Sequence, residues 1–267
     1  MKKFTDFPRT LQFLIIFLFT LLFFYFVIPR LIPATVEVQV YISELDGASG
    51  HFSVSLRRIL EIIFMGPILS VVYFFLMKYI TSGIDIKGKR EKYALALIEM
   101  GVILCICINC MGHAIHMMFD TASWMYYGAN GQQMDTSELY SYIYFSDEWL
   151  GHLLIHLALF GFITLALCAE FLHLRAERMS SDEILYSLLL GCGMSLIAYT
   201  TYEGQAAIVL LILWCSLLII ELSLILMNKI NILDRPILLA TLVNNLIVIA
   251  MFFTWILLFG LKPYYPW

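Results

Sequence analysis

Residues 99–120 read EMGVILCICINCMGHAIHMMFD, an apolar run that polar side chains interrupt at helical spacing. A run of about 20 apolar residues has the length that a helix needs to cross a bilayer. The polar side chains Asn109, His113, His116 and Asp120 follow one another every three or four residues. At about 100° per residue they share a stripe roughly 60° wide on such a helix. The segment therefore predicts a membrane-spanning helix with one polar face.

The rest of the chain has the same apolar character. Of its 267 residues, 61% are hydrophobic and 13% are charged, and the net charge is -4. A soluble fold of this size would expose more charge, and the small net charge indicates no nucleic-acid partner. We predict an all-α, polytopic membrane protein, a single domain over residues 1–267 with about seven transmembrane helices. The predicted spans are residues 11–32, 59–82, 93–118, 149–172, 184–201, 206–228 and 236–261.

The distribution of lysine and arginine predicts the orientation of these helices, because basic loops are retained on the cytoplasmic side of a membrane. With the N-terminus inside, twelve of the sixteen basic side chains are cytoplasmic and four are external. We therefore expect a cytoplasmic N-terminus and an external C-terminus, with residues 119–148 outside. The first span is too long for a typical signal peptide, so we expect it to remain as an uncleaved anchor.

A second polar stretch follows the external segment, where residues 147–156 read DEWLGHLLIH. On a helix, Glu148, His152 and His156 share one face. Asp147 falls on another side if the helix has already begun there. Because the connection between the two spans is external, the two pairs of histidines lie at a similar depth and can converge.

This convergence predicts a metal site near the outer membrane face. Neutral imidazole is the commonest protein ligand for zinc, copper, iron and nickel, and an acid or amide one turn away can orient the ring. We expect a divalent transition metal, zinc first, with copper, iron or haem as alternatives. The predicted metal ligands are His113, His116, His152, His156, Asn109 and Glu203, an acid just after the fifth span. The predicted catalytic acids or bases are Glu148, Asp120 and Asp147.

The same helices allow two other interpretations, one in which the histidines are structural and one in which sulfur side chains bind copper(I). Histidines near helix ends also cap carbonyl groups or face headgroups, and one HxxxH pair is a weak motif. Cys107, Cys110, Met111 and Met118 offer soft ligands to copper(I), but they lie roughly 90° to 170° around the helix from the histidines. We expect sulfur and imidazole not to share one site. All six cysteines fall within apolar runs, so no disulfide framework is predicted.

The segments outside the spans carry weaker signals. Alternation of polar and apolar residues over residues 36–42 predicts a short strand. Aromatic side chains in the external segment predict an interfacial helix that begins near Asp135. Glu170 and His173, at the inner end of the fourth span, are expected to meet the cytoplasm.

The predicted bundle resembles the alkaline ceramidases and the progestin and adipoQ receptors, in which a seven-span fold holds zinc through histidines and an acid near one membrane face. Those families place an HxxxH pair in the last span. Here residues 236–261 contain no histidine, and the pair His152 and His156 lies in the fourth span. The resemblance implies zinc-dependent cleavage of lipid amides without membership of either family. Membrane di-iron hydroxylases and desaturases need about eight cytoplasmic histidines, and this chain has six.

The leading hypothesis is a membrane-embedded, metal-dependent hydrolase of lipid-like amides or esters, with membrane lipid as its partner. Its first rival is a transition-metal transporter or sensor, in which Glu99, Glu170 and Glu221 continue a path inward. The second rival is a redox protein with haem or copper, such as an oxidase or monooxygenase subunit. Asn244 and Asn245 in the last span predict interhelical hydrogen bonds. A homo- or hetero-oligomeric state is left open.

Overall fold

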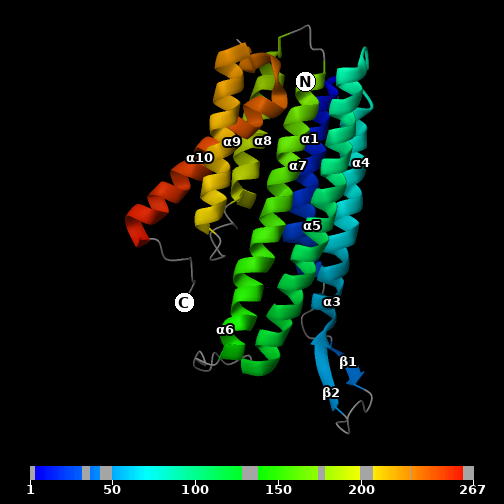
Figure 1. Cartoon of the computed structure of the whole chain (residues 1–267), viewed down its shortest axis with the longest axis vertical. Coiled ribbons are helices and arrows are strands. Elements are labelled where there is room, and N and C mark those ends of the chain that lie inside the picture. The colour runs from blue at the N-terminus through cyan, green and yellow to red at the C-terminus, as the bar shows by residue number, and fades with distance from the viewer. Residues whose placement is uncertain are drawn as a thin grey trace.

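A computed structural model describes residues 4–31, 37–42, 50–127, 138–173, 178–198, 207–228 and 230–260. These residues form an elongated bundle of helices with one β-hairpin projecting from the end opposite the N-terminus (Figure 1). The α-helices are α1 (Arg9–Leu22), α2 (Ile28–Leu31), α3 (Leu56–Ile63), α4 (Leu69–Thr81), α5 (Lys89–Tyr127), α6 (Glu138–Tyr144), α7 (His152–Leu172), α8 (Ser181–Ala198), α9 (Ala207–Asn228) and α10 (Pro236–Phe259). The other elements are the π-helices η2 (Phe23–Val27), η3 (Phe64–Ile68) and η4 (Phe145–Gly151), the 3-10 helices η1 (Phe4–Asp6) and η6 (Ile232–Asp234), and strands β1 (Glu37–Ile42) and β2 (Gly50–Ser55).

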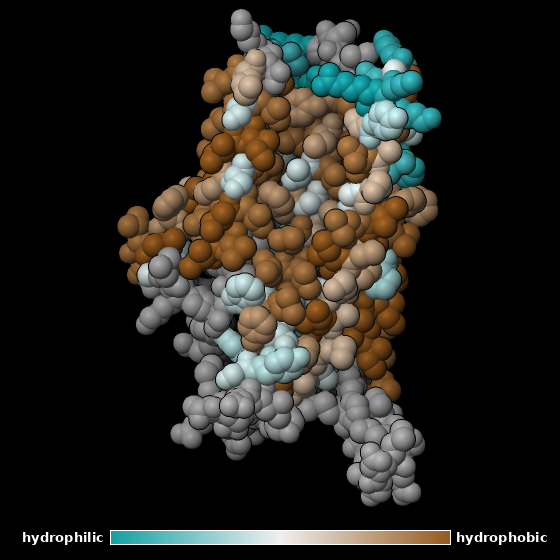
Figure 2. Space-filling model, in the orientation of Figure 1, coloured by the Kyte–Doolittle hydropathy of each residue, from teal (hydrophilic) through white to brown (hydrophobic). Residues whose placement is uncertain are grey.

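Each predicted span coincides with a helix or with a run of consecutive helical elements. Among the described residues, four helices are long and apolar enough to cross a membrane: Arg58–Thr81, Lys89–Ser123, Ser141–Leu172 and Pro236–Leu258. Figure 2 shows hydrophobic residues over most of the visible face, while hydrophilic residues gather at the end that carries the N-terminus. This distribution is typical of a helical protein that meets lipid along its sides.

Two helical segments extend beyond the predicted spans. Helix α5 continues to Tyr127, past the predicted end of the third span at residue 118. Helical structure also begins before residue 149, because α6, η4 and α7 run continuously from Glu138 to Leu172. The predicted interfacial helix is therefore the first part of this long helical segment, and Asp135 itself lies outside the described residues.

The hairpin confirms the predicted strand and adds its partner. Strands β1 and β2 pair antiparallel, with Glu37 opposite Ser55 and Ile42 opposite Gly50. The partner strand also alternates polar and apolar residues in its sequence, a signal that period-two analysis of residues 50–55 would have found.

The centre of the bundle is packed from helices far apart in sequence. Phe162 of α7, Leu11 and Leu14 of α1, Leu69 of α4 and Leu217 of α9 are among its largest fully buried side chains. Lipid tails are as apolar as leucine, so van der Waals contact rather than water exclusion holds such helices together in a bilayer.

Candidate functional site

The first half of the polar face of α5 is buried in the bundle, and the second half, His116 and Asp120, is partly exposed. The side chain of His113 is 3% exposed, and that of Asn109 is also buried. The Asn109 amide donates to the backbone oxygens of Met65 (3.1 Å) and Gly66 (3.4 Å) and to Ser70 Oγ (3.1 Å). Met65 and Gly66 belong to η3, where Pro67 interrupts regular helical hydrogen bonding. Asn109 thus satisfies backbone groups of the neighbouring helix as well as lying one turn from His113.

The π-helix η4 decides which acid reaches the histidines. Asp147 is 6% exposed, and its Oδ1 lies 2.5 Å from Nδ1 of His116. The prediction that Asp147 faces another side is wrong, because it assumed α-helical rotation through a segment that is wider than an α-helix. Glu148, predicted to share the histidine face, has its Oε2 3.9 Å from His152 Nε2, beyond hydrogen-bonding distance.

Two glycines allow the helices that carry the histidines to approach each other closely. A Cβ atom added at Gly151 would lie 2.9 Å from Cα and Cβ of His116. A Cβ atom at Gly112 would lie 2.8 Å from the backbone nitrogen of Ile155. Small residues at both contact points let the backbones of α5 and the η4–α7 segment touch, which brings their polar side chains together.

The imidazole rings form a contiguous group at this contact, which we call the histidine cluster: His113, His116, His152 and His156, with Asp147. The ring centroids of His116 and His152 are 4.4 Å apart, and those of His152 and His156 are 6.2 Å apart. Nδ1 of His156 is buried and has no hydrogen-bond partner. The cluster therefore holds at least one imidazole nitrogen that the protein itself does not use.

Asp120 and Glu203 are the remaining predicted site residues. Asp120 forms an ion pair with Arg58 of α3, with 2.8 Å between Oδ2 and the guanidinium nitrogen. The sequence does not predict this pair, because only the fold brings α3 beside the end of α5. Glu203 lies outside the described residues.

The cluster has the donor types that bind a transition metal, but its side chains do not converge on one point. Imidazoles beside a hydrogen-bonded carboxylate are typical of zinc and copper sites. Within the described part of the chain, no three His, Cys, Asp or Glu side chains converge closely enough to hold an ion. Binding of an ion would therefore require these side chains to move from the positions described.

Three of the four sulfur side chains considered on α5 lie on the outer surface of the helix, as predicted. Met111 and Met118 are 54% and 64% exposed, and Cys107 is exposed too. Cys110 is the exception, because its Sγ lies 3.6 Å from Ser70 Oγ, which also binds Asn109. All six cysteines are free thiols, in agreement with the absence of a predicted disulfide framework.

A second polar group lies at the other end of α7, which we call the α7–α10 clamp: Glu170, His173 and Arg235. The Glu170 carboxylate accepts hydrogen bonds from the backbone nitrogens of Ile237 (2.7 Å) and Leu238 (2.8 Å), in the first turn of α10. The Arg235 guanidinium donates to the backbone oxygens of Glu170 (2.6 Å) and His173 (3.0 Å), at the end of α7. Glu170 is 1% exposed, so the expectation that it meets the cytoplasm is wrong.

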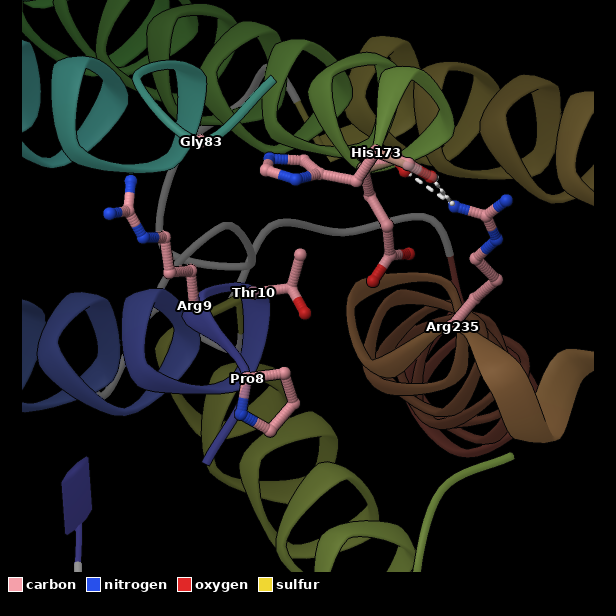
Figure 3. Close-up of a pocket in the computed structure, with 7 residues that line it drawn as sticks. Pro8, Arg9, Thr10, Gly83, His173 and Arg235 are labelled. Atoms are coloured by element: carbon pink, nitrogen blue, oxygen red, sulfur yellow. Dashed lines mark hydrogen bonds between the residues drawn. The ribbon is translucent and has the colours of Figure 1, made fainter. Parts of the chain in front are cut away.

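The clamp borders a partly open pocket of about 400 Å³. Arg9 and Arg235 lie on opposite sides of it, with Thr10 between them (Figure 3). His173 Nε2 lies 2.8 Å from the backbone oxygen of Ile80. Burial, together with the charges of Arg9 and Arg235, lowers the pKa of His173, although the bond to Ile80 acts in the opposite direction. His173 is therefore neutral at neutral pH and donates this hydrogen bond.

The acids proposed for an inward path have different surroundings. Glu99 is exposed and pairs with Lys78, 2.5 Å from Nζ to Oε1. Glu170 is committed to the clamp. Glu221 of α9 is fully buried and bonds to Asn245 of α10, which confirms an interhelical role for that asparagine.

No family model matches this sequence, and neither a curated protein nor a solved structure matches it.

Proposed function

We propose that the chain is a multi-pass membrane protein with seven spans, a cytoplasmic N-terminus and an external C-terminus. Four sufficiently long apolar helices support the proposal, as does the hydrophilic end of the molecule at the N-terminus. The histidine cluster then lies toward the outer face, because it is formed at the end of α5 and the start of α7.

We further propose that the histidine cluster binds a divalent transition metal, zinc first. The hydrogen bond between Asp147 and His116 carries this proposal. A carboxylate on Nδ1 fixes the ring orientation and tautomer and leaves Nε2 facing outward as a ligand, which is the usual arrangement around metal-bound histidine. Nδ1 of His156 is a second buried nitrogen, and it has no hydrogen-bond partner. Buried polar atoms normally have partners, so this nitrogen also supports a bound ligand.

The reaction that best fits this cluster is hydrolysis of a lipid-like amide or ester. A bound zinc ion supplies a water of lowered pKa and a Lewis acid for the carbonyl group. Of the three predicted catalytic acids, Asp147 is engaged with His116 and Asp120 with Arg58. We assign Glu148, which is partly exposed and lies beside His152, to accept the proton from water.

Metal analysis of the purified protein tests the proposal. The protein is prepared in lipid nanodiscs, and its metal content is measured beside that of His116→Ala, His152→Ala and His173→Ala. We expect stoichiometric metal in the wild type and in His173→Ala, which changes a histidine outside the cluster. The two cluster variants should lose it. Metal-free wild type, or equal content in all four proteins, would refute the proposal.

A second experiment separates hydrolysis from transport and redox chemistry. Glu148→Gln should retain the metal and lose cleavage of a fluorescent amide or ester lipid. A transporter would instead take up metal into vesicles, and it would cleave neither the amide nor the ester lipid. A visible spectrum of the same sample distinguishes haem or copper(II) from colourless zinc.

A further inference from the structure

Helix α9 carries one acid, Glu221, in an otherwise apolar sequence, AIVLLILWCSLLIIELSLILMN. Its side chain is 0% exposed. Its partner on α10 is Asn245, and Thr241 and Asn244 of the same helix are also fully buried. A buried acid of α9 thus lies beside a group of buried polar side chains of α10.

The hydrogen bonds between these side chains form one chain, from Asn244 through Asn245 to Glu221. Asn244 Nδ2 donates to Asn245 Oδ1 (3.3 Å), and Asn245 Nδ2 donates to Glu221 Oε2 (2.7 Å). Glu221 Oε1 and Asn244 Oδ1 are both buried and have no partner. The chain of amides therefore leaves two acceptor oxygens, one at each end, without a donor.

The charge of Glu221 is not compensated by the protein. Glu221 makes no ion pair within the described residues, and the sequence of α10 contains no ionisable side chain. On α7, which also packs against α9, Glu170 is bound to the first turn of α10. A buried carboxylate without a cation costs several kcal/mol, roughly, so such a group takes up a proton or a cation.

We propose that Glu221 binds one monovalent cation, a proton or a sodium ion, in the interior of the bundle. One positive charge neutralises the single carboxylate, whereas a divalent ion would leave an excess charge in an apolar surrounding. The Thr241 hydroxyl, which donates to the backbone oxygen of Ile237 (2.9 Å), is also within hydrogen-bonding reach of the Glu221 carboxylate and lies beside the site. This site lies between α9 and α10, apart from the histidine cluster between α5 and α7, and does not depend on metal binding there.

Thermal unfolding in nanodiscs, followed by tryptophan fluorescence, tests the site. Wild type is compared in sodium chloride and choline chloride at equal ionic strength, from mildly acidic to mildly alkaline buffer. A sodium site predicts a higher Tm in sodium than in choline. A proton site predicts no difference between the salts and a Tm that falls as the pH rises, because deprotonation leaves the carboxylate without a counter-charge. Glu221→Gln, which mimics the neutral acid, should abolish whichever response the wild type shows.

The control is Glu99→Gln, which changes an exposed acid paired with Lys78 and should leave the response intact. Glu221→Ala, which removes the carboxylate, should abolish the same response if Glu221→Gln does not fold. The proposal is wrong if either variant responds to sodium and to pH as the wild type does. It is equally wrong if the wild type responds to neither.

Discussion

The two ends of α7 carry polar groups of similar composition that are used in opposite ways. In the α7–α10 clamp, the acid and the arginine bind backbone groups at helix ends, two hydrogen bonds each. In the histidine cluster, side chains contact one another, and a buried nitrogen of His156 has no partner. Helix ends leave backbone amides and carbonyls that must be satisfied, so the clamp has a sufficient structural explanation. The cluster lacks one, and this difference is our reason for placing function there.

The largest expected effect is loss of the clamp acid. Glu170→Ala should lower the free energy of unfolding by about 3 kcal/mol or more, because two buried amides lose charged acceptors. Glu170→Gln keeps one acceptor oxygen and should cost about half as much. Denaturant unfolding in detergent measures both, with Glu99→Gln as the exposed-acid control. If a clamp variant were as stable as this control, the clamp would not stabilise the fold, and the contrast with the histidine cluster would be lost.

The next effect concerns the close contact that forms the cluster. Gly151→Ala places a methyl group against the His116 backbone and should cost about 1–3 kcal/mol. It should also reduce metal content, because the two helices must separate. Gly193→Ala is the matched control, since its Cβ meets only the flexible end of Leu18. Unfolding curves and metal analysis of both variants test this, and retention of metal by Gly151→Ala would show that the contact is not needed.

A smaller effect is expected from the acid that orients His116. Asp147→Asn keeps the shape and removes the charge, so metal affinity should fall by about 10- to 100-fold with little change in stability. Titration with zinc against a competing chelator measures the affinity. Glu148→Gln should leave this affinity near the wild-type value, and a reversed order of the two variants would exchange the roles assigned to the two acids.

The smallest effect is a pH dependence at the clamp. Because the folded protein lowers the pKa of His173, the neutral form stabilises the fold above the unfolded pKa, and this contribution is lost as the pH falls through the folded pKa. His173→Gln cannot gain a proton, so its Tm should fall less than that of the wild type on mild acidification. Parallel curves for the two proteins would contradict the assignment of a neutral His173.

The sequence predicts the helices and the convergence of the histidines, because apolar length and a spacing of three or four residues are local properties. It does not predict the position of Asp147, because nothing local announces that residues 145–151 form a π-helix. It also misplaces Glu170, whose partners are backbone amides 67 and 68 residues away. The ion pair between Arg58 and Asp120 was not predicted for the same reason, since it depends on how α3 and α5 pack.

The π-helix η4 also has a genetic consequence. An α-helix needs one residue fewer than a π-helix to cover the same turn. Deletion of a single codon within residues 145–151 would therefore relax this segment to an ordinary helix and keep the residues before it in register with α7. With Trp149 deleted, Asp147 would precede His152 by four residues, the α-helical spacing that places two side chains on one face. An in-frame deletion of Trp149 would thus show whether the acid needs the π-helix itself or only the face that the π-helix gives it.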